Sequence, residues 1–150
     1  MSEITWVCKS FASLTAAELY EALKLRSEVF VVEQNCVYLD LDDKDQDSFH
    51  LFGWKDDNLL AYARILPPGL AFDEASIGRV VSSPSSRKTG AGRALMNKAI
   101  EETFSLFGTH DIKIGAQLYL LDFYSTLGFK QVSEPYVEDG ILHIKMILSK

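Results

Sequence analysis

The spacing of hydrophobic positions changes along the chain, and its first part predicts a strand followed by a helix. Residues 4–11 alternate weakly between apolar and polar, as a half-buried strand does. Thr15 and Glu18 have the spacing of a capping box, in which each side chain accepts a hydrogen bond from the other residue's backbone N–H. The helix predicted behind it covers roughly residues 16–30 and carries a stripe formed by Leu19, Leu23, Arg26 and Phe30.

The middle of the chain predicts three strands and a long amphipathic helix. Two apolar runs flank an Asp-Asp-Asn turn, so residues 49–66 are expected to form a hairpin. Residues 75–83 predict a further strand, which Pro84 ends. Behind Gly92, an apolar face with helical spacing runs to a capping Gly108, and it consists of Leu95, Met96, Ala99, Ile100, Thr103 and Phe104.

The last third predicts a strand, a short helix and a second hairpin. Residues 112–119 have the pattern of a strand, and residues 120–128 that of a short helix ending at a glycine. Two apolar segments, 129–137 and 141–148, flank the turn sequence Glu-Asp-Gly, which is a hairpin signal. The chain shows no repeat and no linker. The order of elements therefore predicts one α/β domain over residues 1–150, with helices packed on a mixed sheet.

Composition excludes several classes of protein. The 150 residues are 47% hydrophobic, enough for one buried core, yet no apolar run is long enough to span a bilayer. The first ten residues include Glu3 and no apolar signal core, so we expect no targeting segment and a cytoplasmic location. The net charge of −6 argues against a nucleic-acid partner, because phosphate binding requires a basic face. Cys8 and Cys36 lack C-x-x-C spacing and are expected to be idle thiols in a reducing compartment.

Charge is unevenly distributed, which suggests ligands of opposite sign. Residues 75–100 contain no acidic side chain but five basic ones, and this cationic island favours a locally held anion. Residues 40–47 contain five aspartates and one lysine, which indicates either an electrostatic funnel for an amine or a solvated surface loop, the commoner case. An EF-hand is excluded, because Asp45 and Leu51 occupy the positions that require Gly and Glu, and we predict no metal site.

A glycine turn lies between a predicted strand and the long helix. Gly90 and Gly92 let an anion approach the backbone closely, and the first turn of a helix leaves N–H groups without intrahelical partners. A P-loop is excluded because Arg93 follows Gly92, and a dinucleotide fingerprint is excluded because Leu95 occupies its third glycine position. The remaining pattern is R-x-x-G-x-G, with Arg87 as its arginine.

This pattern resembles the pyrophosphate signature of the GNAT (GCN5-related) N-acetyltransferases, which use acetyl-coenzyme A (acetyl-CoA). The segment FYSTLGF supplies the tyrosine and the Gly-Phe pair that the family carries behind its next strand, as Tyr124, Gly128 and Phe129. Further segments, among them LRSEVFVVEQNCVYLDLD, IGRVVSS and GAQLYLLDFY, resemble the ElaA-type branch, and the resemblance covers nearly the whole chain. It implies the GNAT fold, a mixed and mostly antiparallel sheet of about seven strands, splayed in a V and flanked by helices.

The resemblance implies a cofactor site along one strand and the glycine turn. The backbone that would pair with the pantetheine arm is that of Val80, Val81 and Ser82. The diphosphate would be held by the turn and the first helical residues, which are Arg87, Lys88, Thr89, Gly90, Ala91, Gly92 and Arg93. The strand that carries Gln117 would splay away from Val81 and open a cleft for the thioester. The short helix would complete the cofactor site with Phe123 and Tyr124.

The family's mechanism maps onto two of these residues. The N–H of Val81 would stabilise the developing oxyanion, and Tyr124 would protonate the departing thiolate. Tyr124 could instead pack on the sheet or only hydrogen-bond the cofactor sulfur. Neither the cofactor motif nor the short helix contains a cysteine, which favours direct attack by a primary amine in a ternary complex.

The base and the acceptor site are less well defined by the sequence. Candidates around the acceptor pocket are Glu33, Gln34, His50 and His143. Glu33 could act as the base or bind a cationic amine, His143 could be a structural partner, and a water chain could replace a single base. The acceptor is a small-molecule or protein amine, and the family is compatible with a homodimer. The alternative to an enzyme is a domain that binds acyl-CoA as a sensor without turnover.

Overall fold

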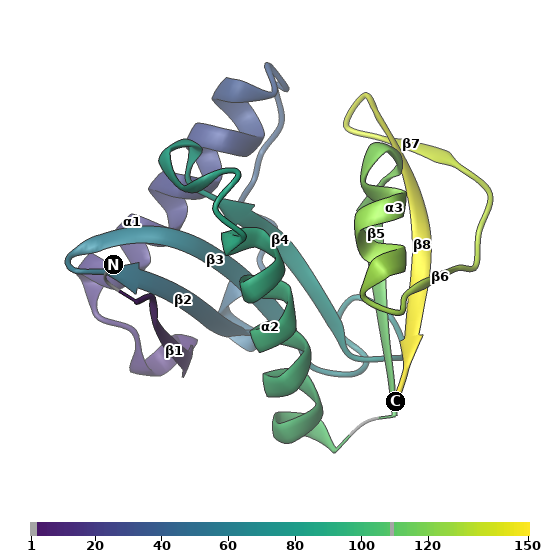
Figure 1. Ribbon diagram of the computed structural model, residues 1–150, viewed down its shortest axis with the longest axis horizontal. Coiled ribbons are helices and arrows are strands. Elements are labelled where there is room, and N and C mark those ends of the chain that lie inside the picture. The colour runs from purple at the N-terminus through teal and green to yellow at the C-terminus, as the bar shows by residue number, and fades with distance from the viewer. Residues whose placement is uncertain (1–2, 109) are drawn as a thin grey trace.

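Two antiparallel sheets form the frame of the computed structural model, which describes residues 3–108 and 110–150 (Figure 1). The first sheet has the order β1-β2-β3-β4, with strands Thr5–Ser10, Phe49–Lys55, Asn58–Leu66 and Ser76–Ser82. The second has the order β5-β8-β6, with β7 also paired to β8. Its strands β5, β6, β7 and β8 are Asp111–Gln117, Lys130–Gln131, Tyr136–Glu138 and Ile141–Ser149.

The two sheets touch where β4 and β5 begin. Among the described residues, Ala75 and Ile112 form the one parallel bridge, and Lys113 N–H donates to the Ala75 carbonyl at 2.9 Å. Beyond this point β4 and β5 are not paired, and Figure 1 shows them diverging in a V. The predicted α/β fold class, with a mostly antiparallel sheet and a splay, is therefore confirmed.

The strand count differs slightly from the prediction, because the strand expected over residues 129–137 breaks into β6 and β7. Between them, Ser133 Oγ accepts a hydrogen bond from Lys145 N–H at 2.8 Å, in place of a backbone carbonyl. Pro135 follows and has no N–H to donate to a ladder. The chain therefore leaves β8 after β6 and returns to it as β7.

Helices cover both faces of the first sheet, and alternation along its strands separates two cores. α1 (Ala16–Arg26) packs on the face that carries Phe52, and α2 (Ala91–Phe107) packs on the face that carries Leu51. The short α3 (Leu121–Thr126) joins the α2 core, which also contains apolar side chains of β5 and β8. Among the described residues, none of the helices combines the length and apolar character needed to cross a bilayer.

α1 starts as predicted but ends differently. The capping box is present, with Glu18 N–H donating to Thr15 Oγ1 at 3.0 Å and Thr15 N–H donating to the Glu18 carboxylate at 2.8 Å. The α-helix stops at Arg26 and continues as a π-helical segment, Ser27–Glu33. Ser27 Oγ donates to the Leu23 carbonyl at 2.6 Å, and such back-bonding loosens the helical ladder. The wider turn carries Glu33 and the following residues toward the gap between the sheets.

A β-bulge interrupts β4 where the two sheets part. Tyr62 of β3 pairs with Val81, but Arg64 pairs with Gly78, so Arg79 and Val80 together oppose one residue of β3. Arg79 has a φ of 51°, an uncommon value for a residue with a side chain. The extra residue reverses the alternation, and Val81 therefore packs in the α1 core although Ile77 packs in the α2 core.

The acidic loop is not the solvated loop that the sequence favoured. Three of its aspartates form ion pairs of 2.7–3.4 Å with arginines of α1, β3 and β4, in the pairs Arg26–Asp40, Arg26–Asp45, Arg64–Asp42, Arg64–Asp45, Arg79–Asp40 and Arg79–Asp42. The side chain of Arg26 is fully buried. Burial alone would raise the pKa of Asp45, but the hydrogen bonds from Arg26 and Arg64 lower it. The loop is thus anchored to the sheet by charge.

His50 belongs to this buried cluster and not to the acceptor pocket. It is 1% exposed, its Nδ1 lies 2.6 Å from Tyr62 Oη, and its Nε2 lies 2.9 Å from the Asp45 carbonyl. Both ring nitrogens are therefore occupied by protein groups. The expectation that His50 borders the acceptor is wrong, because its ring is buried and bound by Tyr62 and the Asp45 backbone.

Candidate active site

The divergence of β4 and β5 opens a cleft of about 770 Å³ between the two sheets. Its walls come from β4, β5, the π-helical segment, α3 and the β7–β8 hairpin. The structure brings together nine of the residues expected at the cofactor and acceptor sites, which are Glu33, Gln34, Val80, Val81, Ser82, Arg87, Gln117, Tyr124 and His143. The other predicted residues do not line this cavity; they are Lys88, Thr89, Gly90, Ala91, Gly92, Arg93, Phe123 and His50.

The glycine turn forms the start of α2 at the rim of this cleft, next to Arg87. Gly90 precedes the helix with a φ of 84°, and the first helical hydrogen bond runs from Ala94 N–H to the Gly90 carbonyl at 3.1 Å. Among the described residues, no side chain caps this end of α2. The N–H groups of Ala91, Gly92 and Arg93 therefore have no intrahelical partner. The helix starts at Ala91, two residues earlier than the predicted start behind Gly92.

Gly92 gives a direct test of whether this turn fits an anionic group. A Cβ at this position would meet no atom within 4 Å, and its φ is not in the left-handed region. The folded chain itself thus does not need glycine there. An uncapped helix start with open space at Gly92 fits the diphosphate of a CoA thioester.

Two predicted cofactor residues, Arg93 and Phe123, do not line the cleft and contact each other instead. The Arg93 guanidinium lies 5.5 Å from the centre of the Phe123 ring and donates a 2.8 Å hydrogen bond to Thr126 Oγ1. Arg93 and Phe123 therefore join the start of α2 to α3. This contact holds the helix start beside the helix that carries Tyr124.

Tyr124 projects from α3 into the cleft. It is 6% exposed, and its ring makes edge contacts with Phe123 and Phe129 at centroid distances of 5.2 and 5.9 Å. Burial, followed by the neighbouring Tyr119, raises the pKa of its phenol to about 12. Tyr124 therefore carries its proton throughout the neutral range and is available as a hydrogen-bond donor.

Glu33 lies at the mouth of the cleft and is bound to Arg87, the arginine of the R-x-x-G-x-G pattern. The two guanidinium nitrogens donate to the two carboxylate oxygens at 2.8 and 2.5 Å, and both side chains are 41% exposed. The hydrogen bond from Arg87 lowers the pKa of Glu33. A carboxylate held in this way is a poor proton acceptor, so this geometry does not favour Glu33 as the general base.

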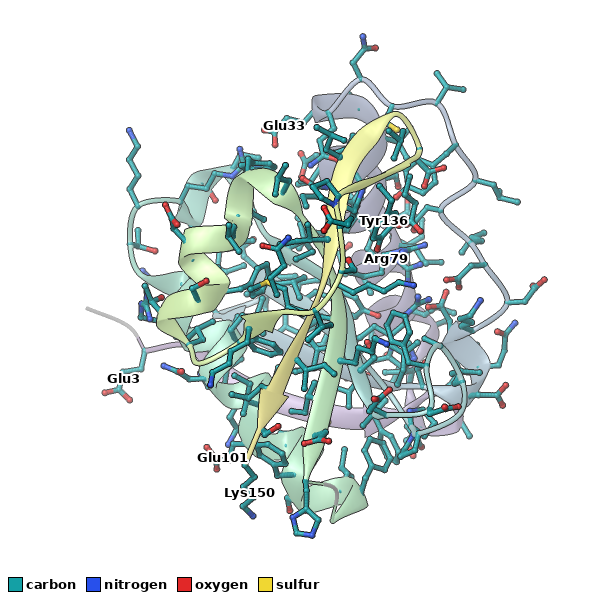
Figure 2. All side chains as sticks on the ribbon, turned by 90° about the vertical axis from the view of Figure 1, so that its right-hand side faces the viewer. Glu3, Glu33, Arg79, Glu101, Tyr136 and Lys150 are labelled. Carbon is teal, nitrogen blue, oxygen red and sulfur yellow. The ribbon has the colours of Figure 1, made fainter. Side chains whose placement is uncertain are left out.

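The opposite wall of the cleft contains residues that the sequence reasoning did not find. Tyr136 of β7 and Phe72 of the β3–β4 connection line it, and Lys145 Nζ lies 5.6 and 5.8 Å from the centres of their rings. In the view of Figure 2, Tyr136 and Arg79 lie close together, and both line the cleft. Tyr136 is the Cα partner of His143, so the alternation of the last hairpin was the signal that could have placed it.

Cys8 and Cys36 are free thiols, as expected. Cys36 lines the cleft, and its thiol donates to the Asp139 carbonyl at 3.0 Å. Among the described residues, no group of three or more His, Cys, Asp or Glu side chains is placed to hold a metal ion. Three aspartates of the acidic loop, Asp40, Asp42 and Asp45, are paired with arginines instead.

A splayed pair of strands, parted at a bulge and faced by an uncapped helix start, is the arrangement of the GNAT acyltransferases. Comparison with known proteins agrees. Residues 13–150 match the family described as the acetyltransferase (GNAT) domain, and the chain belongs to that family.

Similar proteins cover nearly the whole chain. The protein ElaA of Escherichia coli is 43% identical over 145 residues, which is 95% of each chain. A UPF0039 protein of Synechocystis is 43% identical over 146 residues, 97% of this chain and 95% of the relative. The crystal structure of an acyl-CoA N-acyltransferase from Pseudomonas aeruginosa superimposes with a TM-score of 0.93 at 43% identity, covering 97% of this chain and 99% of that one. The chain is thus an ElaA-like member of the GNAT family.

Proposed function

We propose that the protein transfers an acetyl group from acetyl-CoA to a primary amine, by direct attack in a ternary complex. The observation that carries this proposal is the uncapped start of α2, with open space at Gly92, at the rim of a cleft that β4 and β5 create by parting. The similar P. aeruginosa protein is named as an acyl-CoA N-acyltransferase, which supports an acyl-CoA donor.

The proposed binding of acetyl-CoA relies on a charged side chain and on backbone groups. Arg87 and the N–H groups of residues 88–93 would hold the diphosphate, because amides at a helix start and a nearby guanidinium both favour an anion. The backbone of Val80, Val81 and Ser82 would pair with the pantetheine arm. The bulge at Arg79 supports this, because a bulged residue leaves the regular ladder to the neighbouring strand.

Acyl transfer needs a hydrogen-bond donor for the carbonyl oxygen and a proton donor for the departing sulfur. Acetyl-CoA supplies the acyl group in activated form, as a thioester. Ser83 N–H donates to the Leu60 carbonyl at 2.7 Å, so by alternation Tyr62 and Val81 form the next hydrogen-bonded pair and Val81 N–H faces β3, which does not favour the role expected for it. Val80, in the bulge, has no partner in this register, and its N–H would donate to the carbonyl oxygen as negative charge develops on it. Tyr124 holds its proton at the phenol oxygen, and a hydrogen bond from that oxygen stabilises the developing thiolate and then supplies its proton.

The test of this function is a thiol-release assay with acetyl-CoA and a panel of amines. The panel contains a polyamine, an amino sugar and a lysine-containing peptide. Turnover with one of them supports the proposal. Stabilisation by acetyl-CoA without thiol release from any of them would instead identify an acyl-CoA sensor. Acetyl-CoA at 100 times its Kd should add about 2.7 kcal/mol to the free energy of unfolding in either case.

Gly92→Ala separates the needs of the cofactor from those of the fold. We expect the free energy of unfolding to stay unchanged or to rise by about 0.5 kcal/mol, because alanine is a better helix former. Affinity for acetyl-CoA should fall on the order of tenfold, because the added methyl group keeps the diphosphate from approaching the backbone N–H groups closely and so weakens hydrogen bonds that contribute about 1.5–3 kcal/mol each. Chemical unfolding and titration calorimetry measure the two effects. Gly90→Ala is the control, because its φ of 84° makes alanine costly even without cofactor. Unchanged affinity in Gly92→Ala would contradict the diphosphate site.

Glu33→Gln tests the two roles that the sequence left open for this carboxylate. Without the charge, Arg87 is released for the diphosphate, so we expect acetyl-CoA to bind slightly more tightly and kcat to remain near the wild-type value. The measurement is a steady-state assay together with a binding titration. A fall in kcat of about 10²-fold or more, with unchanged binding, would show that Glu33 is the base after all.

A further inference from the structure

We propose that His143 is the general base of the reaction, with its Nε2 taking the proton of the attacking amine; this inference rests on the proposed function. The sequence contains three histidines. His50 is buried with both ring nitrogens bound, and His110 is exposed beyond the far end of β5 from the cleft. His143 lines the cleft itself.

Hydrogen bonding determines which nitrogen of His143 carries the proton. Its Nδ1 lies 2.8 Å from the carbonyl oxygen of Ile141. A carbonyl oxygen only accepts, so Nδ1 must donate and must carry the hydrogen. In the neutral ring Nε2 then has a free lone pair, which is the form a general base requires. His50 has the opposite arrangement, because its Nε2 must donate to the Asp45 carbonyl.

Register places His143 on the cleft side of the second sheet. Its Cα pairs with that of Gln117 at the end of β5 and with that of Tyr136 on β7. Ile144, its neighbour in sequence, points to the opposite face and belongs to the α2 core. His143 is 9% exposed. Gln117 beside it lines the cleft and lies on β5, the strand that would border the thioester. The imidazole is therefore nearly desolvated and close to the gap where the acyl group is expected.

Neighbouring groups support uptake of a proton. Glu138 Oε2 lies 3.8 Å from Nε2 and would stabilise the imidazolium that forms. The Tyr136 ring stacks on the imidazole with a centroid distance of 5.9 Å and an angle of 26°, which fixes its orientation. The other charged groups of the second sheet that line the cleft are Lys145, two residues along the same face of β8, and Asp139 in the turn. The facing elements add Glu33, Asp42, Lys44, Arg64, Arg79 and Arg87. Of these groups, Glu138 is the anion nearest to Nε2.

The proton balance of the step is complete with the groups named. The amine nitrogen forms a bond to the acyl carbon while the carbon–sulfur bond breaks, and no electrons are exchanged with a redox partner. The amine gives one proton to His143 Nε2, and Tyr124 gives one to the sulfur. His143 then returns its proton to solvent through the open cleft, and Tyr124 regains one from solvent. The products are an amide and the free thiol of CoA.

His143→Gln is the decisive variant, since glutamine is polar but cannot take up a proton. We expect kcat/KM for the amine to fall by about 10²-fold or more, with the Kd of acetyl-CoA unchanged. The ratio of wild-type to variant kcat/KM should decrease toward acid pH, because only the wild type loses its base; the ratio cancels the titration of the amine itself. His110→Gln is the matched control and should behave as the wild type. A ratio that does not change with pH would overturn the assignment.

Nitrogen-15 NMR tests the geometry without turnover. We expect His143 to carry its proton on Nδ1 and His50 on Nε2, with the resonances assigned from His143→Gln. A proton on Nε2 of neutral His143 would overturn the inference. The two proposals fail separately: absence of thiol release with every amine refutes the proposed function, whereas normal turnover in His143→Gln refutes only the assignment of the base.

Discussion

Tyr124→Phe is expected to lower kcat by about 10²-fold or more, because the variant lacks the proton that the departing thiolate requires. Affinity for acetyl-CoA should stay the same. The ring packs against Phe123 and Phe129, and phenylalanine keeps those edge contacts. Since burial raises the pKa of the phenol to about 12, the wild type keeps this proton across the neutral range. The loss should therefore be the same at every neutral pH.

The measurement is steady-state thiol release, paired with a binding titration. Tyr20→Phe is a suitable control, because Tyr20 is 67% exposed on α1 and does not line the cleft. If kcat stayed at the wild-type value, Tyr124 would only pack on the sheet, and the leaving group would have to obtain its proton elsewhere.

Asp45→Asn is expected to destabilise the fold by about 3 kcal/mol, since removing one partner of a buried ion pair leaves its cations uncompensated. Asp45 is 6% exposed and accepts from both Arg26 and Arg64 at 2.9 Å. Each arginine retains one other aspartate, which keeps the loss from being larger. Urea unfolding measures the change. Asp47→Asn is the control in the same loop, because Asp47 is exposed. Equal stabilities for the two variants would show that the cluster contributes little.

The same cluster makes the free energy of unfolding depend on pH in the acid range. Hydrogen bonds from Arg64 lower the pKa of Asp42 in spite of its burial, and the pKa of Asp45 is lowered in the same way. A carboxyl with a lowered pKa contributes stability above its unfolded pKa of about 3.9. That stability is lost as the pH falls toward the lower folded value. In Asp45→Asn, unfolding free energy should therefore decline less steeply in this acid range.

Local patterns predicted the elements whose signals lie close together in the chain. The capping box of Thr15 and Glu18, the turn before Asn58 and the left-handed Gly108 each depend on a few neighbouring residues. The end of α1 and the division into β6 and β7 were not predicted. Both depend on single side-chain hydrogen bonds, from Ser27 and to Ser133, that compete with the regular backbone pattern.

The candidate site was predicted in the same unequal way. The glycine turn and Tyr124 were found because the motif lies within a short segment and resembles a known family. Phe72, Tyr136 and Lys145 were missed, since they come from three segments that only the folded chain brings together. Glu33 and His50 were identified by residue type, but their partners could not be read from the sequence.

The sequence by itself determined the order of helices and strands and the family, because periodicity, caps and glycine motifs act over short stretches of chain. Only the tertiary structure decided which charges are paired. The aspartates of the acidic loop pair with arginines 14 to 39 residues away, and Glu33 pairs with Arg87 at a separation of 54 residues. The pKa and the role of a carboxylate depend on the groups within a few ångströms of it. For these residues, those groups are distant in the sequence and come close only when the chain folds.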